Sequence, residues 1–169
     1  MRIEPFRPRH LSELILQPHQ RAWQGRVSAG HARVLGRQGQ AWSGFGADGR
    51  PVACAGVLDR GEGRGLAWAL LAADLGPGGF VALHRAVSRG MAAMPYRRIE
   101  AHVAAGFAPG RRWARLLGFA FEGVMRGYLA DGGDALLFAR LNAKPIGAIP
   151  IGAIPTPAPD QGHSPPAPR

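Results

Sequence analysis

Apolar and polar positions over residues 1–143 follow two different periods. Continuous apolar runs and period-two alternation predict strands, whereas apolar residues three or four positions apart predict helices. The expected strands are Arg2–Phe6, Ala41–Phe45, Val52–Leu58, Leu66–Ala72, Ile99–Ala104, Phe119–Glu122 and Ala135–Leu141. The expected helices are residues 8–16, His19–Ala29, Gly78–Met94 and Pro109–Leu117. This β-α-α-β-β-β-α-β-α-β-β order predicts an α/β fold, in which the strands form one mixed sheet and the helices pack against it.

Two of these strands are expected at the centre of the sheet. Leu66–Ala72 is apolar throughout, which is typical of a strand buried on both faces. The helix Gly78–Met94 connects it to Ile99–Ala104, so the two strands should run parallel through a right-handed crossover. Elsewhere, Asp48-Gly49 predicts a hairpin turn between two neighbouring strands.

The composition changes after Asn142, which divides the chain into a domain of residues 1–143 and a tail of residues 144–169. The tail contains eight prolines and repeats Pro-Ile-Gly-Ala-Ile from Pro145 and again from Pro150. Proline at this density favours an extended arm. Its apolar residues are expected to dock on neighbouring subunits; they are Ile146, Ile149, Ile151 and Ile154. The alternative is a disordered terminus.

The overall composition indicates a packed, soluble protein. Apolar residues make up 46% of the chain and charged residues 19%. The longest apolar run, residues 65–73, is too short to cross a bilayer, and the first residues lack a secretory pattern. The single cysteine, Cys54, excludes an internal disulfide framework and a cysteine-based zinc site, and no metal is expected. We expect a protein that is located or assembled inside a cell, with no membrane partner.

The chain is strongly basic, with 21 Lys and Arg against 11 Asp and Glu. Such a charge suits nucleic acid, a phosphorylated cofactor or an acidic protein. The arginines are scattered along the chain, however, and an arginine-rich composition also follows from a GC-rich genome. Nucleic acid is therefore not the expected partner.

Residues 97–141 carry a family resemblance in four segments. These are Arg98-Ile-Glu-Ala-His-Val103, Arg112-Trp-Ala-Arg-Leu-Leu-Gly-Phe119, Phe121-Glu-Gly with Met125-Arg126, and Asp134-Ala-Leu-Leu-Phe-Ala-Arg140. Together they resemble the GNAT superfamily of acyl-CoA-dependent N-acetyltransferases, in its ribosomal-protein and antibiotic branch. The resemblance implies a GNAT fold and, if the protein is active, acetyl-CoA as cofactor.

The resemblance also implies where a cofactor would lie. GNAT enzymes hold the CoA pyrophosphate on backbone amides at the start of the central helix, where an anion is favoured. The matching positions are Gly76 and Gly78, with Gly79 beside them, and Arg111 and Arg112 could add positive charge.

This sequence departs from the GNAT cofactor pattern at several positions. Ala73 stands where the family has Gln or Arg, and Phe107 stands where the family has a cofactor-contacting Asn. Pro77 removes one N–H donor, and Asp74 adds a negative charge beside the expected phosphates. We therefore expect no bound cofactor.

Acetyl transfer to an amine needs a base and an acid. Glu100 shares a strand face with His102 and is the best candidate for the base, and Tyr128 is the candidate for the acid. Each has a structural alternative. Glu100 could pair with Arg98 or Arg126, and Tyr128 could be a rim residue with its hydroxyl in water.

Two functions remain open from the sequence. The first is a non-catalytic GNAT-fold component of a virion or its assembly, because the pattern resembles the acetyltransferase-like proteins of podoviruses and prophages. The proline-rich arm would then hold neighbouring subunits in an oligomer. The resemblance implies a location in the cytoplasm of the host cell or in the virion. The alternative is an active acetyl-CoA-dependent N-acetyltransferase that modifies a protein or a small amine.

Overall fold

Seven strands pair into one mixed sheet in the computed structural model, which describes residues 1–23 and 27–142. The spatial order is β1-β2-β3-β4-β5-β7-β6. The strands are β1 Arg2–Pro5, β2 Gly39–Phe45, β3 Pro51–Asp59, β4 Arg64–Leu71, β5 Arg98–Ala104, β6 Ala120–Met125 and β7 Ala135–Leu141. The helices are α1 Pro8–Ser12, the 3₁₀ helix η1 Pro18–Trp23, α2 Ala29–Arg37, α3 Pro77–Ala93 and α4 Ala108–Leu116. The expected mixed α/β fold is confirmed.

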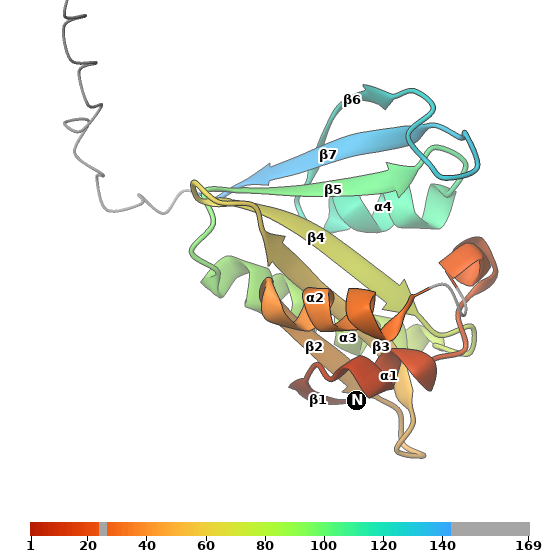
Figure 1. The fold of residues 1–169 in the computed structure, drawn as a ribbon. Helices are drawn as coiled ribbons and strands as arrows, with labels where there is room; N and C mark the ends of the chain where they lie inside the picture. The colour runs from red at the N-terminus through yellow and green to blue at the C-terminus, as the bar shows by residue number, and fades with distance from the viewer. Residues whose placement is uncertain (24–26, 143–169) are drawn as a thin grey trace, which may run out of the picture.

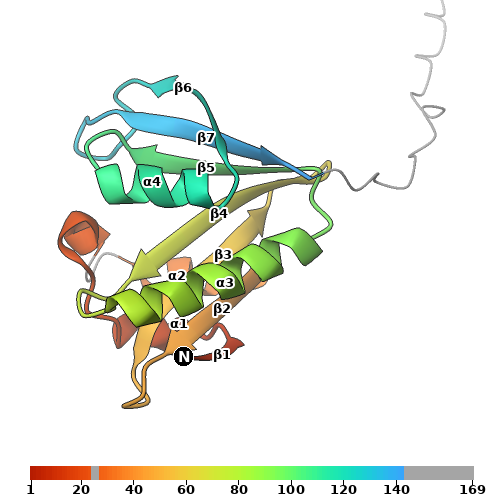
Figure 2. The same ribbon diagram turned by 180° about the vertical axis from the view of Figure 1, so that it is seen from behind.

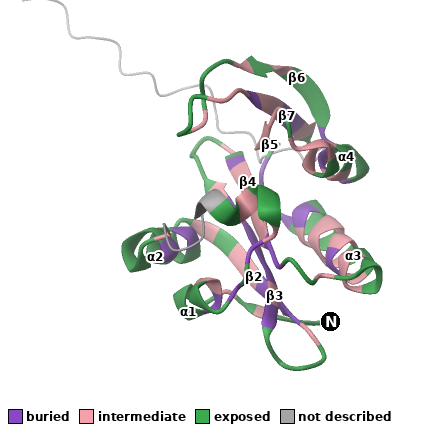
Figure 3. Cartoon of the chain, turned by 90° about the vertical axis from the view of Figure 1, so that its right-hand side faces the viewer, coloured by how far each residue is buried: buried purple, intermediate pink, exposed green. Residues whose placement is uncertain are grey.

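Helices cover both faces of the sheet (Figures 1 and 2). In the side view, α1 and α2 lie on one side, while α3 and α4 lie on the other, with buried residues between them (Figure 3). The larger core joins α3, α4, β5 and β7; its fully buried side chains include Met94, Ile99 and Phe138. A second core under α1 contains Leu14 and Cys54, both with no exposed surface.

The parallel pairing of the two central strands is confirmed. Residues Arg64–Ala67 of β4 pair with Arg98–Ala101 of β5, and every other strand pair in the sheet is antiparallel. Beyond these four pairs the two strands diverge (Figures 1 and 2). The second half of β4 consequently borders a gap. Residues 68–70 are only half-buried and Leu71 is buried, so the expectation that the strand is buried on both faces throughout is wrong.

The N-terminal helices differ from the prediction. The first ends at Ser12 instead of reaching residue 16. Of the predicted helix His19–Ala29, residues 24–26 lie outside the described part of the chain, and residues 19–23 belong to the 3₁₀ helix η1. The second α-helix begins later, at Ala29, because the Ser28 hydroxyl accepts a hydrogen bond from the His31 amide and caps it. Two glycines in this helix lower its helical propensity, which is why the sequence pattern did not predict it.

No helix in the described part of the chain is long and apolar enough to cross a membrane.

Candidate functional site

The divergence of β4 and β5 opens a cavity of about 660 Å³. Its walls come from both strands and from the helices α3 and α4, and are mainly apolar; they include Leu66, Trp68, Leu70, Val87, Met91 and Trp113. A concave apolar site with a few polar groups is the usual form of a ligand-binding site. This cavity is therefore the candidate functional site of the described residues.

Two residues with acid–base chemistry meet at the cavity. Nδ1 of His102 on β5 lies 2.9 Å from the hydroxyl of Tyr128, which follows β6, and the two rings meet edge to face. Burial lowers the pKa of His102, which keeps the imidazole neutral near pH 7 and able to accept a proton. Tyr128, the predicted acid, thus lines the cavity, and its hydroxyl bonds to His102, which the period-two pattern places on the same strand face as Glu100.

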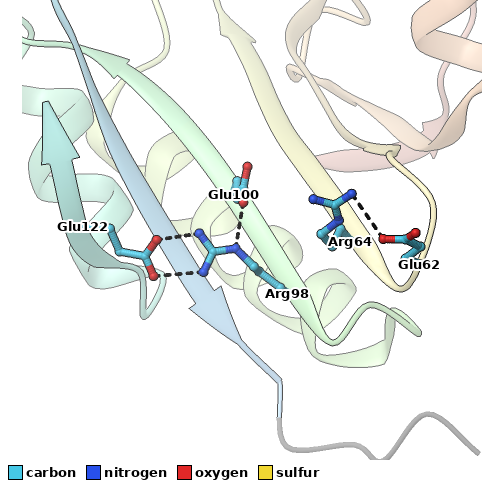
Figure 4. A network of polar contacts seen from close by, with 5 residues as sticks. All are labelled: Glu62, Arg64, Arg98, Glu100 and Glu122. Carbon is cyan, nitrogen blue, oxygen red and sulfur yellow. Dashed lines mark hydrogen bonds and ion pairs between the residues drawn. The ribbon is translucent and has the colours of Figure 1, made fainter. Parts of the chain in front are cut away.

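Glu100, the predicted base, lies outside this cavity. It borders a separate polar pocket of about 400 Å³, together with Asp59, Arg60, Arg64 and Gly65. Its Oε1 accepts a hydrogen bond of 2.7 Å from Nε of Arg98, the ion pair that the sequence left as an alternative (Figure 4).

Arg98 also binds a second carboxylate. Its two terminal nitrogens donate to Glu122 at 2.9 and 2.5 Å, so the guanidinium lies between two glutamates (Figure 4). Hydrogen bonds from Arg98 lower the pKa of Glu122, and the two glutamates raise the pKa of Arg98. Glu122 is thereby held in the charged form, and both glutamates are bonded to the same arginine.

The predicted phosphate-binding residues lie at the start of α3 but do not line the cavity. Gly76 caps the helix and Pro77 is its first residue. The amides of Gly78 and Gly79 belong to the first helical turn and so have no intrahelical acceptor. A Cβ at Gly79 would approach Leu75 to 2.7 Å, whereas Gly78 faces open space.

Asp74 lies just before this helix and carries a charge that opposes an anion. Its carboxylate is 3.7 Å from Arg50, which in turn binds Asp48 at 2.7 Å in the β2–β3 turn. Both side chains of the Arg50–Asp74 pair are more than 60% exposed, so Arg50 neutralises Asp74 only weakly.

The start of α4 lines the cavity, but not with the two arginines that were predicted to bind the cofactor. Pro109, Gly110 and Trp113 line it, while Arg111 and Arg112 do not. Phe107, at the position where the family has Asn, stacks on His19 with ring centroids 4.8 Å apart.

Trp113 of α4 contacts two residues of α3 beside the cavity. Its ring lies 5.5 Å from that of Phe80, and its indole N–H donates to Nδ1 of His84 at 3.3 Å.

Other chemistry is sparse in the described residues. Over residues 1–23 and 27–142, no three His, Cys, Asp or Glu side chains are grouped to hold a metal ion. Cys54 is fully buried, and burial raises the pKa of its thiol to about 11, so it packs as a small apolar residue. The predicted partner-binding residues Ile146, Ile149, Ile151 and Ile154 lie outside the described part of the chain.

Known proteins match this chain in structure. No protein-family model matches it, and no curated protein matches it in sequence. Among solved structures, it is similar to the ribosomal-protein-S18-alanine N-acetyltransferase from Escherichia coli, with a TM-score of 0.68 at 16% identity over 87% of this chain and 97% of that chain. It is also similar to an acetyltransferase of the GNAT family from Streptococcus pneumoniae, with a TM-score of 0.63 at 16% identity over 83% and 98%. Ard1 from Thermoplasma volcanium gives a TM-score of 0.66 at 13% identity over 85% and 98%.

The chain therefore has the GNAT acetyltransferase fold. At these identities, the likeness shows the fold alone.

Acetyl-CoA, the cofactor of GNAT enzymes, does not fit this site as the family holds it. Pro77 takes one amide from the phosphate cradle at the start of α3, and Asp74 places a carboxylate beside that cradle. The side chain of Phe107 is packed on His19 and offers no hydrogen bond in place of an asparagine amide.

Proposed function

We propose that this protein is a non-catalytic, acetyltransferase-like component of an assembly, of the kind that podoviruses and prophages encode. The observation that carries the proposal is the start of α3, where Pro77 and Asp74 oppose the binding of a pyrophosphate. The Arg98 ion pairs support it, because they engage Glu100, the carboxylate best placed by sequence to act as a base. The protein would act in the host cytoplasm or within the virus particle.

The tail gives such a component a means of holding its neighbours. Its two Pro-Ile-Gly-Ala-Ile repeats present four isoleucines without an intervening charge. Each buried isoleucine contributes on the order of 1.5–3 kcal/mol, offset in part by the entropy lost when the tail becomes ordered. Proline reduces that loss by restricting the unbound tail. Docking on a neighbouring subunit would therefore be favourable and would make the protein an oligomer.

Thermal unfolding with acetyl-CoA tests the first part of the proposal. A ligand at 100 times its dissociation constant stabilises a protein by about 2.7 kcal/mol, which is easily seen as a rise in Tm. We expect no rise at millimolar acetyl-CoA. Micromolar binding in isothermal titration calorimetry would refute the proposal.

Sedimentation of two chain lengths tests the second part. Residues 1–169 should form an oligomer, while residues 1–143 should sediment as a folded monomer with an unchanged circular dichroism spectrum. Assembly of the truncated chain to the same size would show that the tail is not what holds the subunits.

The alternative is an active acetyl-CoA-dependent N-acetyltransferase for a protein or small amine. The contact between His102 and Tyr128 favours it, because a neutral imidazole and a hydroxyl both line the cavity. In that case, His102→Gln would abolish acetylation of an amine, whereas under the first proposal there is no acetylation for this substitution to remove.

A further inference from the structure

The edge of β4 that faces the gap has no paired strand beyond Ala67, yet backbone groups of residues 69 and 71 on this edge still form hydrogen bonds. Pairing with β5 stops at Ala67, and β4 continues to Leu71. Backbone groups left without partners beside an apolar cavity would be costly. The segment Ile15–Gln20, which we call the strap, supplies those partners.

Four hydrogen bonds attach the strap to this edge. The side chain of Gln20 makes two of them: its Nε2 donates to the Ala69 carbonyl at 2.7 Å, and its Oε1 accepts from the Leu71 amide at 2.9 Å. The backbone makes the other two, both at 3.0 Å: the Gln17 amide donates to the Leu71 carbonyl, and the amide of Ala73, two residues past the end of β4, donates to the Ile15 carbonyl.

The Gln20 carboxamide stands where a peptide group of a neighbouring strand would stand. It donates to one backbone group of β4 and accepts from another two residues away, as an added strand does. The side chain of Gln17 fixes its orientation, since Gln17 Nε2 donates to Gln20 Oε1 at 3.0 Å. Both glutamines line the cavity.

The strap also contacts the loop after β5, on the side of the gap opposite β4. His19 stacks on Phe107, which follows β5, with ring centroids 4.8 Å apart. Residues 15–20 therefore bridge from the edge of β4 to the loop after β5, across the place where the two strands diverge.

We infer that the strap is an internal ligand of β4, and that Gln20 closes a slot suited to an extended chain bearing amide groups. The arm of CoA is such a chain, with two amide groups along its length. This inference deepens the proposed function, because it names a second physical cause for the exclusion of the cofactor, independent of the start of α3.

Hydrogen exchange and CoA binding in two variants test the inference. Gln20→Ala removes both side-chain bonds to β4, and Gln20→Glu keeps the size but places an acceptor against the Ala69 carbonyl. Gln40→Ala, at an exposed position on β2, is the matched control. We expect the Leu71 amide to exchange about tenfold faster in Gln20→Ala than in the wild type and the control, because this variant removes its side-chain acceptor and one hydrogen bond is worth about that factor. Gln20→Glu keeps an acceptor for this amide and should exchange more slowly than Gln20→Ala.

CoA itself is the probe for the slot, added to the folded full-length chain and followed by amide chemical shifts. We expect Gln20→Ala to bind CoA at least about tenfold more tightly than the wild type, with shifts at residues 69–71. Equal affinities, or equal exchange of the Leu71 amide, would overturn the inference. Micromolar binding by the wild type would refute the proposed function, and the ratio of the two affinities would still decide the role of Gln20.

Discussion

Nδ1 of His102 and the hydroxyl of Tyr128 lie 2.9 Å apart, although 26 positions separate these residues in the chain. Residue 102 reaches the cavity from β5, where that strand has left β4, and residue 128 reaches it from the loop between β6 and β7. The pair is thus a product of the divergence of the two central strands. Because Glu100 does not line the cavity, His102 and Tyr128 supply its acid–base groups.

The first prediction concerns the ionisation of this pair. Burial is the main cause that lowers the pKa of His102, and Arg60 adds to it, while Glu100 acts in the opposite direction. Histidine proton resonances followed from pH 8 to pH 4.5 should show His102 titrating with a midpoint below 6.5. His102→Gln identifies the resonance by its loss. A midpoint above 6.5 would mean that Glu100 outweighs burial.

The second prediction concerns His10, the buried residue of α1. Its ring is buried, and its Nδ1 lies 2.8 Å from the Ser43 hydroxyl and accepts from the Arg7 amide at 3.3 Å. Burial lowers its pKa in the folded state, so the unfolded chain binds a proton more readily. The stability that the neutral ring contributes is complete above the unfolded pKa of 6.5 and is lost as the pH falls below it.

Urea unfolding at several pH values measures this effect. The free energy of unfolding should fall between pH 7.5 and pH 5, and the fall should be smaller in His10→Gln. Since His102 has a lowered pKa too, His102→Gln is measured beside it to separate the two contributions. An unchanged slope in His10→Gln would show that His10 does not drive the pH dependence.

Most of the fold could be predicted because its strands carry local signals. The apolar run of β4, the Asp48-Gly49 turn and the Leu117-Gly118-Phe119 segment each specify their structure over a few residues. In the turn, Gly49 has a φ of 79°, a conformation that glycine adopts without strain. At the end of α4, Gly118 has a φ of 83° and serves the same purpose.

The candidate site was less predictable, because it depends on contacts between distant segments. Nothing near Gln20 indicates that its side chain bonds to residues 69 and 71. The period-two spacing did place His102 on the face of Glu100, yet only the divergence of β5 from β4 decides which of the two reaches the cavity. The departure at Phe107 was visible in the sequence, whereas its stacking on His19 was not.

The third prediction compares two phenylalanines on neighbouring strands. Phe138 of β7 has no exposed surface, and Phe121 of β6 is 49% exposed; their ring centroids are 5.8 Å apart. Phe138→Ala should lower the free energy of unfolding by about 3–5 kcal/mol because it leaves a cavity in the larger core. Phe121→Ala, the control, should cost about 1–2 kcal/mol, since half of its surface already meets water. Urea denaturation measures both, and equal losses would contradict the packing described for the larger core.

The last prediction concerns Arg98, whose guanidinium binds Glu100 and Glu122. Arg98→Met keeps much of the side-chain length and leaves both carboxylates without their shared partner. It should lower the urea midpoint at pH 7 more than Arg64→Met does, because the 3.4 Å contact of Arg64 with Glu62 is much more exposed to solvent. Hydrogen bonds from Arg98 lower the pKa of Glu122, so their stabilising effect is present above pH 4.5 and is lost as the pH falls. Between pH 7 and pH 3.5 the wild type should therefore lose more stability than Arg98→Met. Parallel pH profiles for the two proteins would show that the ion pairs contribute little to stability and serve only to hold the two carboxylates in place.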